Sequence, residues 1–182
     1  DSARSRHVFL QTLADEFGPA VSPDGRWVAY TSDESSRAEV YVRSFPEPGG
    51  KVQVSLDGGA EARWSKDGRE LYSTADHLGQ HAVFATDAAS GKSRIVVGSG
   101  STLAVQPMAG NRILYGMHSL LGPTELYSVA AKGGAPVPVT RLNAAKVAAA
   151  RFGKPEQFQF TGAHGDPVYG YIVYPVDFDP AK

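Results

Sequence analysis

The chain has 182 residues and a mass of 19.3 kDa, enough for one domain with a buried core. Its 42% hydrophobic content, 20% charged content and net charge of −1 are ordinary for a globular protein and exclude a basic, nucleic-acid-binding surface. Without cysteine there are no disulfides or thiolate metal sites, and without a run of about 18 apolar residues no membrane span is expected. We expect a soluble protein, with the cytoplasm and the periplasm both left open.

Residues 7–12 look like an outer strand that has no unit of its own. The first unit covers about residues 17–55. Asp24-Gly25 is its first turn, because Gly accepts a positive φ and Asp can hydrogen-bond its own backbone. Polar and apolar residues alternate from Glu39 to Arg43, as in a half-buried strand. The expected strands are 19–22, 27–31, 39–43 and 51–55.

Two further units follow, over about residues 60–98 and 102–140. The second has its first turn at Asp67-Gly68 and a loop over residues 76–80, and the third turns around Gly110. Pro138 cannot donate a ladder hydrogen bond, so its strand should lie at an exposed outer edge. The expected strands are 62–65, 70–74, 82–85 and 94–97 in the second unit, and 103–106, 112–115, 125–129 and 137–140 in the third.

The rhythm ends after the third unit. Residues 143–154 are expected to be a linker, whose Ala-rich part favours a short helix or a crossing segment. Residues 155–182 predict a hairpin, because two alternating strands at 156–161 and 168–174 flank a glycine-bearing turn.

An aromatic residue recurs at a constant interval of 43 residues, at Tyr41, Phe84 and Tyr127. A period of about 40–45 residues with four strands per unit is typical of a β-propeller blade. We therefore expect an all-β fold: a partial propeller of about three four-stranded blades over residues 1–142, with an N-terminal outer strand and a C-terminal hairpin. Propellers close with about four to eight blades, so the remaining blades should lie in missing sequence or in a second chain, including a second copy.

The segment from Ser22 to Ser32, echoed by Ser65 to Arg69, resembles the repeat of TolB-type, WD-repeat-like propellers. Residues 118–127, His-Ser-Leu-Leu-Gly-Pro-Thr-Glu-Leu-Tyr, resemble the last propeller blade of the prolyl oligopeptidase family, in its dipeptidyl-peptidase and acylaminoacyl-peptidase-like branch. In that family a hairpin like residues 155–175 and an exit like residues 177–180 open an α/β-hydrolase domain. The resemblance, from about residue 74 to 182, implies a peptide-hydrolysing parent whose propeller caps its active site and restricts access to peptides.

No catalytic residue, cofactor or metal is predicted for this chain alone. The Gly-x-Ser-x-Gly motif is absent, and its nearest approach, at residues 91–95, lacks the second glycine. The first hypothesis is the non-catalytic propeller portion of a serine peptidase, with a missing hydrolase domain as its partner. The second is a TolB-like protein-binding or scaffold module, which the first half favours. The third is an engineered or chimeric fragment that self-assembles, motivated by the unequal halves and by a start without Met or signal core.

Other candidate residues have both a structural and a functional interpretation. His77 and His81 have the spacing of two metal ligands on a helix, but they flank a loop and are expected to be solvated. Asp33-Glu34 and Asp76 occupy equivalent loops that they should cap, with acid–base work or cation binding as the alternative. A structural role is also expected for the remaining histidines, although His118 could instead face a channel. The same role is expected for the two tryptophans, whose alternative is peptide binding. These residues are His7, His118, His164, Trp27 and Trp64.

Overall fold

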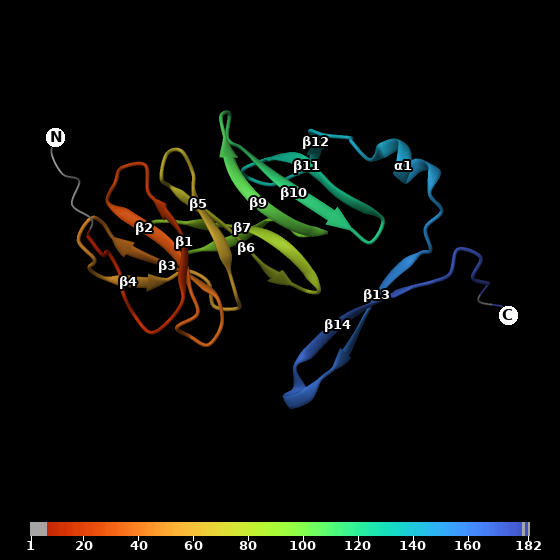
Figure 1. The fold of residues 1–182 in the computed structure, drawn as a ribbon, viewed down its shortest axis with the longest axis horizontal. Helices are drawn as coiled ribbons and strands as arrows, with labels where there is room; N and C mark the ends of the chain where they lie inside the picture. The colour runs from red at the N-terminus through yellow and green to blue at the C-terminus, as the bar shows by residue number, and fades with distance from the viewer. Residues whose placement is uncertain (1–6, 180, 182) are drawn as a thin grey trace.

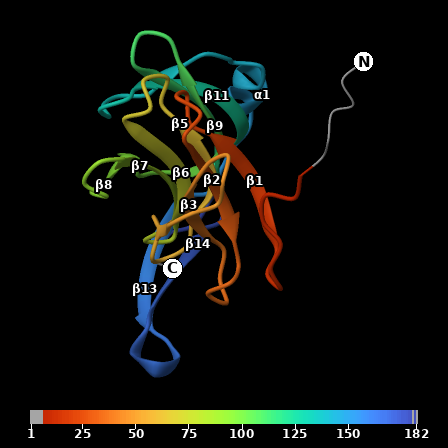
Figure 2. The same ribbon diagram turned by 90° about the vertical axis from the view of Figure 1, so that its left-hand side faces the viewer.

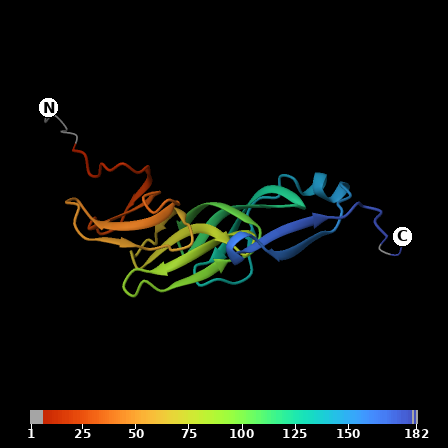
Figure 3. The same cartoon turned by 90° about the horizontal axis from the view of Figure 1, so that it is seen from below.

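The computed structural model describes residues 7–179 and residue 181, and nearly all of its regular structure is β-sheet. Figure 1 shows three successive blades with a hairpin projecting beyond the last one, and Figure 3 shows the same row from below. The all-β fold class is confirmed. Among the described residues, no helix has the length and apolar character needed to cross a membrane.

Blade 1 is a four-stranded antiparallel meander in which neighbours in sequence are neighbours in the sheet. Blades 2 and 3 repeat this pattern, and one parallel residue pair, His81 with Ser101, joins the third strand of blade 2 to the first strand of blade 3. The strands of blade 1 are β1 (Glu16–Val21), β2 (Trp27–Ser32), β3 (Glu39–Ser44) and β4 (Lys51–Gln53). Those of blade 2 are β5 (Ala60–Trp64), β6 (Glu70–His77), β7 (Gln80–Asp87) and β8 (Ser93–Val97). Those of blade 3 are β9 (Ser101–Met108), β10 (Arg112–Ser119), β11 (Gly122–Ala130) and β12 (Val137–Pro138).

A short helix and a hairpin follow the blades. Helix α1 (Ala144–Ala149) contains no buried residue. Strands β13 (Pro155–Thr161) and β14 (Pro167–Val173) pair antiparallel around the 3-10 turn η1 (Ala163–Gly165). Figure 2 shows this hairpin extending away from the blades.

Besides shifts in the ends of several strands, two sequence expectations differ from the structure. Residues 7–12 form no strand, because a strand needs a neighbour to pair with and none of the described strands pairs with this segment. Phe9 instead packs against Phe45 in a tilted arrangement, with 5.6 Å between ring centroids and 49° between the ring planes. The expected loop at residues 76–80 is shorter than predicted, since β6 and β7 continue to a two-residue turn at Leu78-Gly79. The edge position of Pro138 is as expected, because β12 pairs only with β11.

The core lies between the blades rather than within them. Between blades 1 and 2, Ala29 and Val40 pack against Ala62 and Leu71. Between blades 2 and 3 the core is larger and includes Tyr115, which is fully buried. Each interface buries one face of each sheet that forms it, which is how a blade acquires a core.

The first turns of blades 1 and 2 have the same hydrogen bonds. In blade 1 the Ser22 hydroxyl donates to the Asp24 carboxylate at 2.6 Å and accepts from the backbone N–H of Trp27 at 3.0 Å. Ser65 and Asp67 repeat these contacts at 2.7 and 2.9 Å. The glycine after each Asp has a φ of 70°, which an L residue rarely adopts. These turns fix where β2 and β6 begin.

The inner strands contain an irregularity at one repeat position. Gly18, Glu61 and Ala104 stand 43 residues apart, and their φ angles are 63°, 56° and 53°. The ladder register shifts at each of these positions, as at a β-bulge. The Glu61 carboxylate accepts the N–H of Ala104 at 2.8 Å, so the bulge of blade 2 binds that of blade 3.

We expect Asp24→Asn to lower the thermal unfolding midpoint at pH 7 by a few degrees. Hydrogen bonds from Ser22, and then from Arg26, lower the pKa of Asp24 from 3.8 to about 2. A carboxyl group with a lowered folded-state pKa contributes stability above its unfolded pKa and loses it as the pH falls through the folded pKa. The deficit of the variant should therefore shrink as the pH falls from 3.8 to about 2.

Thermal unfolding followed by circular dichroism at several pH values measures this. Asp177→Asn, at an exposed position in the C-terminal exit, is the control and should leave the midpoint unchanged. A deficit in Asp24→Asn of equal size at pH 2 and pH 7 would contradict the assignment.

Candidate functional site: the junction of the blades and the C-terminal hairpin

The hairpin contacts the blades at the tight turn of β6 and β7. Leu78 and Gly79, its two central residues, have φ angles of 51° and 73°, as a two-residue hairpin turn requires. A Cβ atom on Gly79 would lie 2.7 Å from the Tyr169 Cβ and 2.6 Å from the Gln157 side-chain nitrogen. Only glycine allows this close approach of the two hairpins.

Three polar contacts hold the junction. The Gln157 amide donates to the Leu78 carbonyl at 2.6 Å, and the Tyr171 hydroxyl donates to the Gly79 carbonyl at 3.1 Å. The Gln80 amide also contacts the Tyr171 hydroxyl. Gln157 lies opposite Tyr171 in the β13–β14 register, so both side chains project from one face of the hairpin.

The other face of the hairpin is apolar and exposed. Phe158 and Phe160 lie on it with their rings 6.1 Å apart, and Val168 and Ile172 project to the same side. These four side chains are between 36% and 52% exposed. The hairpin therefore presents a polar face to the blades and an apolar face away from them.

A cavity of about 590 Å³ lies beside the junction. Its walls include Gln80 and Ser101 from blade 2 and the start of blade 3, His118 from the end of β10, and Tyr171 from the hairpin. His118 is exposed, and the turn residues Leu120 and Leu121 complete one side. The space opens at the end of the blades that carries the β2–β3, β6–β7 and β10–β11 turns, which we call the hairpin end.

The histidine pair that has metal-ligand spacing is not brought together. His81 lies opposite Asp76 across the β6–β7 ladder, with Nδ1 2.9 Å from the carboxylate, and the Asp76 side chain is 92% exposed. His77 projects from the other face and packs edge-on against Phe84. Within the described part of the chain, no three His, Cys, Asp or Glu side chains group as metal ligands would.

The remaining sequence candidates occupy separate places. Asp33 accepts the N–H of Asp15 at 2.9 Å, and Glu34 pairs with Lys51. The Trp64 indole donates to the Ala20 carbonyl at 2.9 Å and so links blade 2 to blade 1. His164 lies in the hairpin turn with a φ of 61°.

The repeat aromatics are cross-strand partners. Tyr41 stacks on Tyr30 in blade 1 and Tyr127 stacks on Tyr115 in blade 3, with the same interplanar angle of 27°. Desolvation by burial raises the pKa of Tyr115 to about 12, so its hydroxyl stays protonated. In blade 2 the partner of Phe84 is Ser73, and the aromatic pair is missing.

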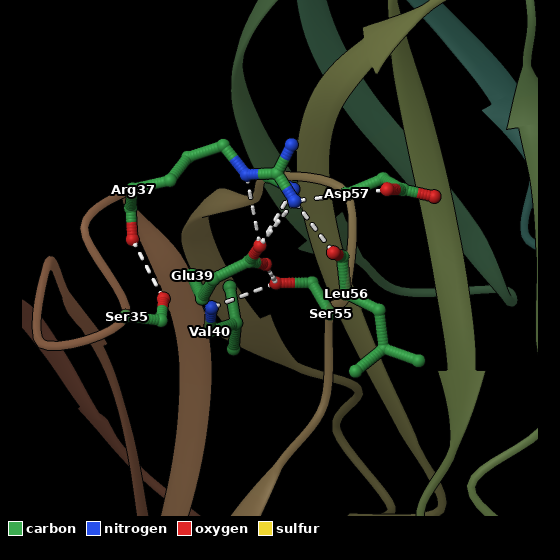
Figure 4. A network of polar contacts seen from close by, with 8 residues as sticks. Ser35, Arg37, Glu39, Val40, Ser55, Leu56 and Asp57 are labelled. Atoms are coloured by element: carbon green, nitrogen blue, oxygen red, sulfur yellow. Dashed lines mark hydrogen bonds and ion pairs between the residues drawn. The ribbon is translucent and has the colours of Figure 1, made fainter.

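A buried carboxylate at the hairpin end was not anticipated from the sequence. Glu39 is 1% exposed, and Figure 4 shows its carboxylate between Arg37 and the loop that joins β4 to β5. It accepts from Arg37 Nε at 3.1 Å, from the Gly58 N–H at 2.9 Å and from the Ser55 hydroxyl. Ser55 in turn accepts the Val40 N–H at 2.8 Å, so the carboxylate fixes the connection from blade 1 to blade 2.

Comparisons with known proteins place this geometry in a fold. No protein-family model matches the sequence, and no curated protein matches it either. Solved structures do match: acylaminoacyl peptidase from Pyrococcus horikoshii has a TM-score of 0.69 at 15% identity, over 96% of this chain and 27% of its own. Dipeptidyl peptidase 4 from Porphyromonas gingivalis gives 0.62 at 18% identity, over 91% and 24%. A TolB-type protein from Agrobacterium tumefaciens gives 0.62 at 14% identity, over 69% and 49%.

The chain has the fold of a β-propeller segment. It spans about a quarter of the length of the two peptidases and about half of the TolB chain. The match to the acylaminoacyl peptidase extends into the hairpin, because residues 155–182 make up more than the 4% of the chain that remains unmatched. The TolB match covers a smaller share of this chain, 69%.

We expect Glu39→Ala to destabilise the propeller segment by about 3 kcal/mol, because it leaves the buried partners of the carboxylate unpaired. Arg37→Ala should cost less, since the Arg37 side chain is 55% exposed and water can replace part of its contact. Urea unfolding measures both, with Glu47→Ala as an exposed control. Equal costs for Glu39→Ala and the control would contradict the role of the network.

Gly79→Ala should release the hairpin from the blades. The new Cβ meets Tyr169 and Gln157, and the positive φ adds backbone strain. Gly110→Ala is the matched control, because Gly110 has a φ of 71° but open space around a Cβ. Hydrogen exchange should speed up in β13 and β14 for Gly79→Ala only. Equal exchange in both variants would mean that the hairpin does not depend on this contact.

Proposed function

We propose that the chain is the non-catalytic propeller portion of a prolyl-oligopeptidase-like serine peptidase, which caps and gates the active site of a hydrolase domain that follows the hairpin. The observation that carries this proposal is the hairpin itself, seated on the β6–β7 turn and included in the match to an acylaminoacyl peptidase. A propeller that acts alone has no need of this addition.

The two faces of the hairpin support the proposal. Gln157 and Tyr171 on its polar face donate hydrogen bonds to the blades, while Phe158 and Phe160 face away from the blades. Exposed apolar surface of this kind commonly marks an interface. A domain that follows the hairpin would bury this face and hold its active site over the hairpin end of the blades.

The position of the cavity supports the gating role. On this proposal the cavity beside Gln80, His118 and Tyr171 lies between the blades and the hydrolase domain. A peptide would have to pass these side chains to reach the catalytic serine, and bulky folded substrates would be excluded. This chain supplies walls and positioning, while the nucleophile, base and oxyanion donors belong to the following domain.

A TolB-like binding module is the second candidate, and the match to a TolB-type structure favours it. On this reading partners bind the propeller surface and no hydrolase follows. The binding-module hypothesis does not explain why the hairpin is amphipathic.

Activity-based labelling separates the two. An antibody against this chain is used to capture the native protein from source cells treated with a fluorophosphonate probe, which labels activated serines. We expect a captured polypeptide longer than 182 residues that carries the probe. The isolated chain should remain unlabelled and should not hydrolyse peptides. Capture of only unlabelled protein would overturn the peptidase proposal and favour the binding module.

A further inference from the structure

The two interfaces between blades are sealed to different degrees. Between blades 2 and 3 the core is continuous, and Tyr127 and Met117 close its margin. Between blades 1 and 2 the buried core has only four residues, and Val42, Val54 and Trp64 beside it are only partly buried. This second core opens to solvent at the end of the blades opposite to the hairpin, which we call the far end.

A pocket of about 300 Å³ occupies this opening. Its walls are largely apolar and come from both blades: Trp27, Val42, Val52, Val54, Trp64 and Leu71. Trp27 is 41% exposed and Val52 is 61% exposed, although both belong to strands. The only two tryptophans of the chain therefore line one pocket. A concave apolar site with a few polar groups at its rim is the usual form of a small-ligand site.

The polar rim carries a net negative charge. Asp24 is paired with Arg26 at 2.7 Å and contributes no net charge. The Asp87 carboxylate accepts the Ser90 hydroxyl and the backbone N–H groups of Ser90 and Ala89, which lowers its pKa and keeps it ionised. Within residues 7–179, no basic side chain lies within ion-pair distance of Asp87. Asp87 is thus an exposed anion without a cationic partner, at the mouth of an aromatic pocket.

We propose that this pocket binds a ligand that joins an aromatic ring to a cationic amino group, with the ring against Trp27 and the cation facing Asp87. Aromatic rings pack well on an exposed indole, and indole is the strongest cation–π partner among side chains. The site is separate from the proposed peptidase cleft, because Asp87 lies opposite Glu70 at the start of β6 while the hairpin contacts the turn beyond the end of β6. It does not depend on the identity of the following domain.

Tryptophan fluorescence of the intact chain tests the proposal, since both reporters lie in the pocket. Phenethylamine is the probe, and phenylacetate, with the same ring and the opposite charge, is its matched control. We expect phenethylamine to shift the emission saturably with a dissociation constant of about 1 mM, as befits so small a ligand. Phenylacetate should bind at least threefold more weakly. No saturable shift with phenethylamine, or equal binding of the two compounds, would overturn the proposal.

Two variants locate the site. Ala88→Phe places a ring at the pocket wall from an exposed position and should abolish binding while the circular dichroism spectrum stays unchanged. Asp87→Asn should weaken phenethylamine about threefold, as expected for one exposed charge, and leave phenylacetate no weaker. Asp76→Asn, at the hairpin end, is the control and should bind like the parent. If Ala88→Phe fails to fold, titration calorimetry of Asp87→Asn decides: unchanged affinity for phenethylamine would place binding elsewhere and overturn the proposal.

Discussion

A four-stranded blade of this size cannot bury a core alone, and the rest of the structure depends on this constraint. Ala29 and Val40 of blade 1 leave water only because Ala62 and Leu71 of blade 2 cover them. The larger core between blades 2 and 3 obeys the same rule. Turns, bulges and the Glu39 network all act to keep neighbouring sheets at the spacing at which their side chains meet.

The same constraint explains why one face of blade 3 is exposed. Leu103, Leu126 and Val137 lie on the face of blade 3 that no described blade covers, and all are exposed. Blade 1 differs, because its tyrosine pair is covered and Lys51 lies over the Tyr41 ring at 5.1 Å from the centroid. The two ends of the row are therefore not equivalent.

The strands and first turns could be predicted because they depend on local chemistry. Asp24-Gly25 and Asp67-Gly68 carry their own hydrogen-bond partners within a few residues, and alternation shows which strand positions are buried. Features that depend on distant partners were not predictable. The extra length of β6 and β7 and the strand expected at residues 7–12 depended on neighbours that the sequence does not identify.

Only part of the candidate site was predictable from the sequence. The hairpin was evident from its alternation, but its contacts with Leu78 and Gly79 join residues 79 and 92 positions apart. Glu39 looked like an ordinary polar strand residue, and only the fold brings the Ser55 loop over it. The pocket with both tryptophans has walls from two different blades, so no local sequence pattern indicates it.

The bulge shared by the inner strands constrains the backbone more than it constrains the side chain. Glycine, glutamate and alanine occupy the same position in three successive blades and adopt almost the same backbone angle. This position therefore requires a backbone conformation rather than a particular side chain, and the bend of the inner strand persists although the three residues differ in size and charge. Residue type is thus a poor marker of the repeat at this position, whereas a positive φ angle marks it in all three blades.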